Sequence, residues 1–546
     1  MLQYKHAMMP SLCFWRPFFH QFSISKEAST SPMVKYVADL HALPAYAAAL
    51  PKVVVIGTKE TPATALAQQI LTRLNNGTAV DTTLLEHAVA QLSAGLDSAA
   101  STHLYVSLGA RGVASVVVAQ LPTFVSRYNT LSRPHAISAL VRSNVPDNKD
   151  VIVAFTLPEH ATTTVSAGVA VAKGISTAYN HKSGGTQSGV ITDGVSTSVA
   201  LDQVVVVFDH TVDASTVSFL NATATGIHLT QRLVDSPPNQ LNTDTFVAEA
   251  KAVAARVHAE ITVIQGEDLN AQGFGGIYGV GKAAANPPAL VVLSHYPSSS
   301  SKSDKSFALV GKGIVYDTGG LSLKTSAFMV GMKHDMGGAA GLLGAFEAAV
   351  LAGTSSRPLH VVLCLAKNAV GPLATHPDDI HTLYSGKTVE INNTDAEGRL
   401  VLGDGVAYAA KHLNPHVILD MATLTGAQGI ATGAKHAAVV SNSAKLEAWV
   451  VSSGRASGDF VHAMPYVPEF FRQEFKSKIA DMKNIPATRM NAQVSCAGQF
   501  IANHLGLEFE QTGLWGHVDM AFPVVDQERG TGFGVALVQS LLQLIV

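Results

Sequence analysis

Short apolar runs alternate with helical patterns along most of this chain, and that alternation restricts the possible fold more than any other feature. Runs rich in valine, isoleucine and leucine predict strands at 261–264, 289–294, 307–310, 360–365 and 417–420. Between them, helical patterns occupy 243–258 and 337–352. Such alternation predicts an α/β fold, with a mostly parallel central sheet flanked by helices on both faces.

The N-terminal third shows the same alternation and predicts a smaller α/β domain. Strands are expected at 53–56, 114–119, 151–155 and 204–208, and a helix at 62–74. A stretch rich in Gly, Ser and Thr at 166–198 predicts loops, and a helical pattern at 218–234 predicts a connector. We therefore predict an N-terminal α/β domain at 34–215 and a C-terminal domain at 216–546, which suits a chain of 546 residues that is 47% hydrophobic.

The segment Asn393-Thr-Asp-Ala-Glu-Gly-Arg-Leu400 places Asp395 and Glu397 two residues apart, with Arg399 two further on. Carboxylates this close repel each other unless a cation lies between them, and a divalent metal ion is the usual partner. An alternative reading is structural, because Thr394-x-x-Glu397 also fits a helix capping box ahead of a periodic apolar stretch.

A second segment, some eighty residues upstream, favours the metal reading. We expect the strand at 307–310 to end in a glycine-rich loop that carries Lys312, Asp317 and Lys324, with Asp335 a little further on. Loops at strand ends hold the chemistry of open α/β sheets. Four carboxylates could then bind two divalent cations that share ligands, and they are Asp317, Asp335, Asp395 and Glu397. Alternatively, Asp335 caps the helix at 337–352 and the lysines are solvated.

Other motifs are incomplete. The Gly-Lys-Gly at 311–313 lacks the remainder of a phosphate-binding loop, and the Tyr278-Gly-Val-Gly-Lys segment lacks the third glycine of a dinucleotide fingerprint. A His-Glu-x-x-His zinc helix is missing from the sequence. His517 and Asp519 would share one strand face, where a structural hydrogen bond is the commoner outcome, so no histidine is assigned to metal.

Together the two segments resemble the paired signatures of the leucyl aminopeptidase family, which are two-metal exopeptidases. The similarity runs from about Arg232-Leu-Val-Asp-Ser-Pro-Pro-Asn239 to the C-terminus. Details such as Tyr384-Ser-Gly-Lys-Thr-Val-Glu-Ile and Asp420-Met-Ala-Thr-Leu-Thr-Gly-Ala are similar to the probable aminopeptidase-like branch. Every metal and catalytic position expected from the family is retained.

The resemblance implies two divalent ions per subunit, Zn²⁺ or Mn²⁺. The tighter ion would be held by Lys312, Asp317, Asp335 and Glu397. The more exchangeable ion would be held by Asp317, Asp395 and Glu397, with a backbone carbonyl near Asp395. Lys312 could coordinate only as a neutral amine, so burial beside a dication would have to remove its proton.

Roles in catalysis and substrate binding are implied in the same way. Lys324 would stay charged and polarise the scissile carbonyl, and Arg399 would hold a bicarbonate ion that acts as general base. Met332, Asn393, Thr423, Leu424 and Gly426 would bind the substrate and favour a leucine-like side chain.

These observations lead us to expect a metal-dependent aminopeptidase that removes the N-terminal residue of peptides with a water activated by two metals. A metal-stabilised scaffold or binding protein of the same fold is the alternative. A two-metal phosphoesterase would leave Lys312 and Lys324 without a role. By resemblance, we also expect a homohexamer.

Bulk properties limit partners and location. A net charge of −3, and equal numbers of acidic and basic residues from Val34 to His210, give no basic surface for nucleic acid. No uninterrupted apolar stretch reaches the ~18 residues of a membrane span.

Three cysteines cannot form a disulfide framework, and the sequon at Asn392 falls inside the expected site, so we predict a cytoplasmic protein. Residues 1–33 hold no acid before Glu27 and predict a disordered extension; a mitochondrial presequence is the alternative.

Overall fold

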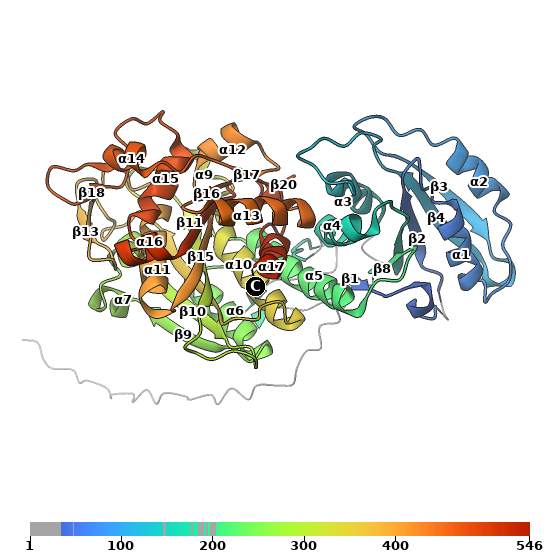
Figure 1. Ribbon diagram of the computed structural model, residues 1–546, viewed down its shortest axis with the longest axis horizontal. Helices are drawn as coiled ribbons and strands as arrows, with labels where there is room; N and C mark the ends of the chain where they lie inside the picture. Colours follow the sequence, from blue (N-terminus) through green and yellow to red (C-terminus); the bar gives the residue numbers. More distant parts are fainter. Residues whose placement is uncertain are drawn as a thin grey trace, which may run out of the picture. The chain divides into compact units, whose positions relative to one another are not determined.

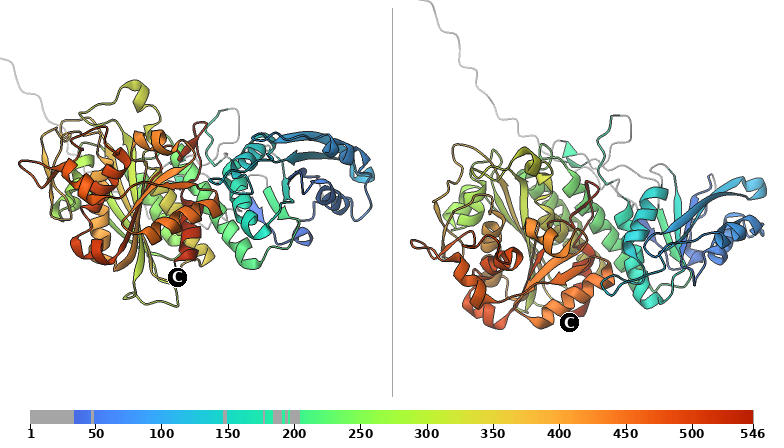
Figure 2. Two further views of the ribbon diagram at one scale, coloured as in Figure 1. Left: turned by 45° about the horizontal axis from the view of Figure 1, so that its top comes forward. Right: turned by 90° about the horizontal axis from the view of Figure 1, so that it is seen from above.

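The structure is a computed structural model that describes residues 34–545, apart from 47–48, 146–148, 176–177, 184–190, 193–194 and 197–203. The expected extension at 1–33 lies outside the described residues. Two large sheets, each covered by helices, form the described part of the chain (Figure 1 and Figure 2).

The N-terminal sheet has six strands in the order β1-β8-β5-β2-β4-β3, all parallel to their neighbours except β3. Its strands are β1 (Val34–Tyr36), β2 (Lys52–Gly57), β3 (Ala100–Ser107), β4 (Val113–Gln120), β5 (Val151–Phe155) and β8 (Val204–Phe208). One face packs against α1 (Thr64–Leu74) and α2 (Thr83–Ala90). The other face packs against α3 (Pro134–Asn144), α4 (His160–Gly174) and α5 (Ala214–Asp235).

The C-terminal sheet has eight strands in the order β17-β16-β19-β15-β11-β12-β10-β9. They are β9 (Glu260–Gln265), β10 (Ala289–His295), β11 (Ser306–Asp317), β12 (Leu359–Asn368), β15 (Pro415–Ala422), β16 (Ala437–Ser441), β17 (Val461–Ala463) and β19 (Leu514–Asp519). The four central strands, β19, β15, β11 and β12, are mutually parallel. The predicted fold class, two α/β domains with a mostly parallel sheet in the larger one, is confirmed.

Both faces of the larger sheet are buried because successive side chains of a strand point to opposite sides. In β11, Phe307 and Leu309 pack on one face, whereas Ala308 and Val310 pack on the other. The first face is covered by α5, α6 (Thr243–Arg256), α10 (Gly337–Ala352), α13 (Ala444–Ser457) and α17 (Val535–Leu544). The second is covered by α8 (Gly275–Gly281), α11 (Gly398–His412) and α15 (Gln493–Ala502).

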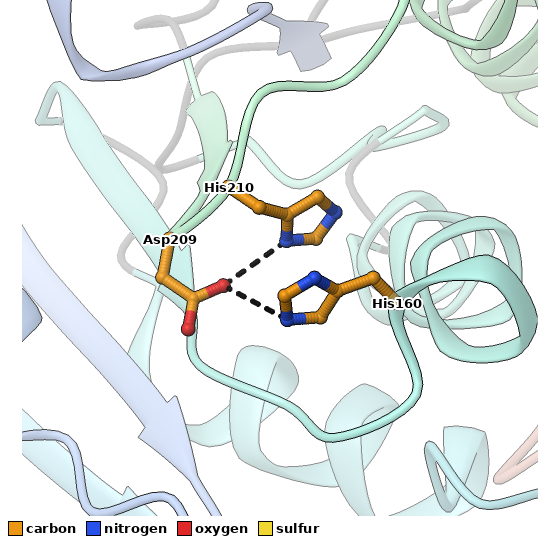
Figure 3. Close-up of side chains that lie close together, drawn as sticks. All are labelled: His160, Asp209 and His210. Atoms are coloured by element: carbon orange, nitrogen blue, oxygen red, sulfur yellow. Dashed lines mark hydrogen bonds and ion pairs between the residues drawn. The ribbon is translucent and has the colours of Figure 1, made fainter.

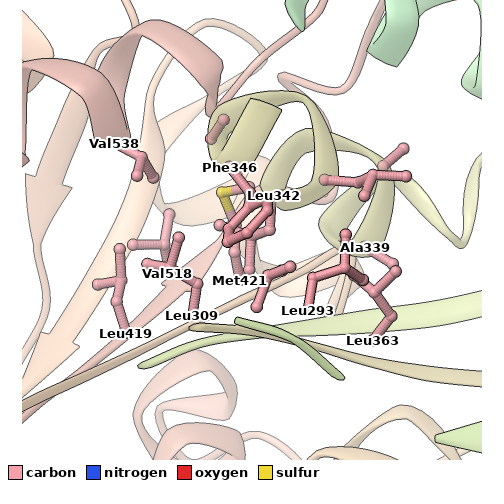
Figure 4. Close-up of a cluster of buried hydrophobic side chains, with 14 of the residues drawn as sticks. Leu293, Leu309, Ala339, Leu342, Phe346, Leu363, Leu419, Met421, Val518 and Val538 are labelled. Atoms are coloured by element: carbon pink, nitrogen blue, oxygen red, sulfur yellow. The ribbon is translucent and has the colours of Figure 1, made fainter. Parts of the chain in front are cut away.

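Helix α10 is the centre of the first core. Its Leu342 and Phe346 lie over the sheet residues Leu309 and Met421 (Figure 4), and burying each such side chain contributes about 1.5–3 kcal/mol. The stretch Ser326–Ala352 is long and apolar enough to cross a membrane, but 83% of its apolar window is buried inside the fold. Its main part, α10, is therefore an interior helix that is apolar all round because it is surrounded by protein.

The shorter elements complete the described part of the chain. They are β6 (Ile191–Thr192), β7 (Val195–Ser196), α7 (Glu267–Ala271), α9 (Ser326–Met329), β13 (Ile380–Thr382), β14 (Thr388–Glu390), α12 (Gly426–Thr432), α14 (Pro468–Phe471), β18 (Met482–Lys483), α16 (Leu507–Thr512), β20 (Val525–Asp526) and β21 (Arg529–Gly530). The 3₁₀ helices of the described residues are η1 (Leu40–Ala42), η2 (Gly109–Arg111), η3 (Met332–His334) and η4 (Arg472–Phe475).

Two sequence predictions about loops are wrong. The strand at 307–310 does not end at Val310, since β11 continues through Gly311 to Asp317, and the loop with Gly319 and Gly320 begins only after Asp317. A Cβ on Gly311 would lie 2.6 Å from the Cα of Ala339, so this glycine serves the close packing of α10 on β11. Within the expected loops at 166–198, residues 166–174 belong to α4, and much of the remainder lies outside the described residues.

Candidate metal and catalytic site

The predicted site residues gather at the carboxyl ends of the central parallel strands. Lys312 and Asp317 belong to β11, and Asp335 directly follows η3. Glu397 directly precedes α11. Because parallel strands present all their carboxyl ends at one edge, residues far apart in the chain meet there.

Three buried carboxylates form the centre of this site. Asp317, Asp335 and Glu397 each offer one oxygen atom, and these three atoms lie within 4.8 Å of one another. The three side chains are almost completely shielded from solvent. The two sequence segments that predicted a metal site are thus brought together by the fold.

Lys312 lies between two of these carboxylates. Its Nζ donates to Asp335 Oδ1 at 2.7 Å and to the Thr423 carbonyl at 2.9 Å, and lies 3.0 Å from Glu397 Oε1. Burial lowers the pKa of Lys312, but the surrounding carboxylates, with Asp335 the strongest, outweigh burial and raise it. Without a competing cation, Lys312 is therefore an ammonium ion.

Lys324 neutralises the outer part of the cluster. Its Nζ lies 2.8 Å from Asp317 Oδ2 and 2.5 Å from Asp395 Oδ1. Burial opposes its charge, but Asp317 and Asp395 raise the pKa of Lys324, so the ammonium persists. The other oxygen of Asp317, Oδ1, accepts hydrogen bonds from the Gly319 amide and from Asn368 Nδ2, both at 2.8 Å.

The remaining oxygens suit a cation. Asp335 Oδ2 and Glu397 Oε2 are buried and have no hydrogen-bond donor among the described residues. Burial, and next the charge of Asp317, raise the pKa of Glu397 to about 6, which reflects this uncompensated negative charge. Four carboxylates face only two lysines here, so a hard divalent cation fits both the donor set and the charge.

The capping alternatives are wrong for both carboxylate segments. Thr394 Oγ1 donates to the Gly319 carbonyl at 2.6 Å, and Glu397 is itself the N-cap residue of α11, without a side-chain cap bond. Met336, rather than Asp335, is the N-cap residue of α10.

Arg399 lies in the first turn of α11. Its Nη1 donates to the Asn484 carbonyl at 3.0 Å, and its buried Nε has no acceptor among the residues that the structure describes. Burial lowers the pKa of Arg399 to about 10, which leaves the group cationic at neutral pH. A cation with an unused donor at a helix N-terminus can hold an anion.

The five predicted substrate-binding residues divide into two groups. Asn393 and Thr423 bond to the carboxylate segments, since Asn393 Oδ1 accepts from the Asp395 amide at 2.9 Å and Thr423 Oγ1 donates to Asp335 Oδ1 at 3.0 Å. The other three flank the site, and they are Met332 at the start of η3, Leu424 after β15 and Gly426 at the start of α12. A Cβ on Gly426 would meet nothing within 4 Å, so open space lies beside it.

Sequence reasoning missed two asparagines that shape the site. Asn368 Nδ2 donates both to Asp317 and to the Thr394 carbonyl, and Asn484 Nδ2 donates to the Asn393 carbonyl. Asn368 pairs with Asp317 in the register of β11 and β12. The sequence signal that could have identified Asn368 is a polar residue at the end of an apolar strand. Asn484 lies in an irregular segment whose sequence has no comparable signal.

Comparison with known proteins agrees with this geometry. Residues 228–539 match the catalytic domain of the cytosol aminopeptidase family, and residues 51–185 match the M17 aminopeptidase N-terminal domain 2. The human protein called probable aminopeptidase NPEPL1 is 51% identical over 427 residues, covering 78% of this chain and 79% of that protein.

Solved structures give the same result. The apo leucyl aminopeptidase of Trypanosoma cruzi aligns with a TM-score of 0.83 and 38% identity, covering 95% of this chain and 98% of that chain. The leucyl aminopeptidase of Leishmania major, solved in complex with actinonin, aligns with a TM-score of 0.82 and 35% identity, covering 94% of each chain.

The chain belongs to the cytosol aminopeptidase family. It is a metal-dependent aminopeptidase, a hydrolase that acts on peptides. The comparisons give no support to a non-catalytic scaffold. The family matches leave residues 186–227 unassigned, so the domain boundary at 215/216 stays a prediction.

Proposed function

We propose that the chain removes leucine-like N-terminal residues with two divalent ions, held by Lys312, Asp317, Asp335, Asp395 and Glu397. The observation that most strongly supports this proposal is the group of three buried carboxylates, each with one oxygen atom within 4.8 Å of the others. Bound there, two such ions would bind the free amine and the scissile carbonyl of a peptide and lower the pKa of a water molecule. Zn²⁺ and Mn²⁺ both suit the nitrogen and oxygen donors of this set.

In this proposal, Lys312 gives up its proton when it becomes a ligand. Its present partners, Asp335 and Glu397, would then turn their oxygens to the ions. Lys324 keeps its proton, because Asp317 and Asp395 stabilise the ammonium, and it donates to the oxygen on which negative charge develops. Arg399 would hold a bicarbonate ion at the start of α11 to accept a proton.

The proposed preference for leucine rests on the surroundings of Gly426. The open space beside this residue, which follows Leu424 by two positions, would accept an uncharged side chain of moderate size. The relative hydrolysis rates of leucyl, glutamyl and arginyl amides test the preference. Faster cleavage of either charged substrate would refute it.

The main test compares wild type with Glu397→Gln for release of leucine from a leucyl peptide in Zn²⁺ or Mn²⁺. Loss of one oxygen ligand should lower kcat/KM by about 10²-fold or more. The exposed Glu508 provides the matched control, since Glu508→Gln makes the same chemical change on α16. An active Glu397→Gln enzyme would refute the proposed ligand set.

The assembly is proposed as a homohexamer. Leu323, Phe328 and Val330, beside the site, expose 60%, 75% and 81% of their surfaces, as is typical of side chains that a partner subunit covers. A monomeric mass by light scattering would refute it.

The proposed location is the cytoplasm. Cys364 and Cys496 are free and buried, which supports a reducing compartment. Fractionation of cells that express the tagged full chain tests this location, and mitochondrial enrichment would favour the presequence alternative.

A further inference from the structure

A second group of metal-ligating side chains, His160, Asp209 and His210, lies in the N-terminal α/β domain (Figure 3). His160 is the first residue of α4, which follows β5, and Asp209 and His210 directly follow β8. β5 and β8 are parallel neighbours, so these residues share the carboxyl edge of the sheet, where open α/β folds bind ligands. The Asp209 amide donates to the Phe155 carbonyl at 2.9 Å, which holds this turn beside the end of β5.

The spacing of the side-chain atoms suits a tetrahedral metal ion. Asp209 Oδ1 lies 3.0 Å from His210 Nδ1 and 3.6 Å from His160 Nε2. Zinc with bonds of about 2.0–2.1 Å holds tetrahedral ligand atoms about 3.3 Å apart, and the two distances fall on either side of that value. The imidazole rings are stacked with centroids 3.7 Å apart and an interplanar angle of 7°, and both turn a nitrogen toward the same carboxylate. Because an ion lies in the plane of each ring that binds it, the partly exposed His160 ring would turn out of this stack when the ion binds.

Thr164 holds the His210 ring at the nitrogen that faces away from Asp209. Thr164 Oγ1 lies 2.7 Å from the His160 carbonyl, to which it can donate its hydrogen, and 3.1 Å from His210 Nε2, which can donate to it or accept from it. His210 Nδ1 faces the Asp209 carboxylate at 3.0 Å, so without an ion it donates its hydrogen to Asp209. As a metal ligand, the ring would carry its hydrogen on Nε2, donate it to Thr164 and offer the Nδ1 lone pair to the ion.

A metal ion would use a ligand atom that the hydrogen bonds leave aside. The bond between His210 and Asp209 leaves His160 Nε2 at 3.6 Å from the carboxylate, beyond hydrogen-bond distance. A single dication would use all three ligand atoms, and a hydrogen bond from His210 Nε2 to Thr164 is the type of outer contact that orients metal-binding histidines.

We propose that His160, Asp209 and His210 bind one divalent transition-metal ion, with Zn²⁺ favoured by the two imidazoles and one carboxylate. The three side chains are 47%, 28% and 21% exposed, which leaves room for water to complete the coordination. The ion would link the start of α4 to the turn between β8 and α5. It would stabilise the N-terminal domain and take no part in peptide hydrolysis.

The test must separate this ion from those of the catalytic cluster. The background is full-length Asp335→Asn/Glu397→Gln protein, and in two further proteins this background also carries His160→Gln or Asp209→Asn. Each protein is stripped with chelator, dialysed against Zn²⁺ at pH 7.5 and measured by elemental analysis. The background protein should hold about one zinc ion more per chain than the other two. Zn²⁺ should raise the melting temperature of the first protein more than that of the other two. His87→Gln, at an exposed histidine of α2, is the matched control and should retain the ion.

Equal zinc content with and without His160→Gln would overturn the proposal and leave the hydrogen bond between His210 and Asp209 as the explanation of the cluster. If the double background does not fold, the same comparison is made between wild type and His160→Gln. Wild type should then bind about one ion more, and equal binding again refutes the site. Leucine release by His160→Gln should match that of wild type at saturating Zn²⁺.

Discussion

Lys312 and Gly398 show how single residues set the geometry of the catalytic site. The Lys312 ammonium contacts Asp335, Glu397 and a backbone carbonyl, so its position sets the positions of two carboxylates. A Cβ on Gly398 would lie 2.6 Å from Cε and 2.7 Å from Nζ of this lysine. Glycine at 398 therefore provides the space that the lysine side chain occupies.

Gly398→Ala should inactivate the enzyme with little loss of stability. The added methyl group would displace the flexible end of Lys312 by a few tenths of an ångström or more, and misplacement on this scale can lower kcat by about 10²-fold. Kinetics with a leucyl peptide and thermal melting measure the two effects. Full activity in Gly398→Ala would contradict the role given to Lys312.

Gly426→Val should change specificity instead. Because open space lies beside Gly426, the larger side chain fits the fold but fills the proposed pocket. We expect kcat/KM for leucyl amides to fall about tenfold relative to alanyl amides, the size of effect that one or two methylene groups have in an apolar pocket. An unchanged ratio would place the pocket elsewhere.

At the scale of elements, neighbouring strands are joined by polar pairs as well as by backbone bonds. Asp420 of β15 lies opposite His517 of β19 in the register of the two strands. Its carboxylate accepts hydrogen bonds from His517 Nδ1 and from Trp515 Nε1, the latter at 2.8 Å. Both partners of the ion pair are fully buried, so each depends on the other for compensation.

This pair should make stability depend on pH. Burial lowers the pKa of His517, but Asp420 outweighs burial and raises it above its usual value of 6.5. A raised folded-state pKa means that the stabilisation is complete below about pH 6.5 and is lost as pH rises through the folded pKa. His517→Gln should cost about 3–5 kcal/mol at pH 6 and progressively less toward pH 9, measured by urea unfolding. A cost independent of pH would show that His517 is neutral.

Gly311→Ala should separate two packed elements. Its Cβ would lie 2.6 Å from the Cα of Ala339, and neither β11 nor α10 can move freely inside the core. We expect the free energy of unfolding to fall by about 1–3 kcal/mol. Gly516→Ala in β19 is the matched control, because its Cβ would meet only leucine methyl groups at 3.2–3.3 Å. Equal stability of the two variants would argue against the close contact.

At the scale of the whole molecule, the two sheets carry ligand groups at the same relative place. In the larger sheet, the end of β11 meets the residue after η3 and the residue before α11, and in the smaller sheet the segments after β5 and β8 meet. The catalytic cluster is buried and the His160–Asp209–His210 cluster is partly exposed. The chain therefore combines a buried group of three carboxylates with a partly exposed group of two histidines and one carboxylate.

Chelation should lower both activity and thermal stability. Ions that bind only the folded state stabilise it by about 2.7 kcal/mol at a concentration 100 times their Kd, and removing them restores repulsion among Asp317, Asp335 and Glu397. Adding Zn²⁺ or Mn²⁺ should reverse both effects in wild type. In Glu397→Gln the gain in melting temperature should be smaller. Activity that survives complete metal removal would contradict the mechanism.

The sequence by itself determined several elements and pointed to the residues of the candidate metal site. Strands β5 and β8 and helix α10 have the bounds that their apolar runs predict, because burial on both faces requires unbroken apolar segments. The crowded acids around Asp395, and the segment from Lys312 to Lys324, predicted the metal site for a similarly local reason: charges so close in sequence need a counter-ion.

Only the tertiary structure decided which partner each group meets. Gly311 is a packing glycine because α10 lies against it, and Asp335 bonds to Lys312 instead of capping a helix because β11 presents that lysine. His160 and Asp209, 49 positions apart, meet because β5 and β8 are neighbours in a parallel sheet. Local sequence patterns cannot predict such contacts, because the partners belong to distant segments that only strand order and register bring together.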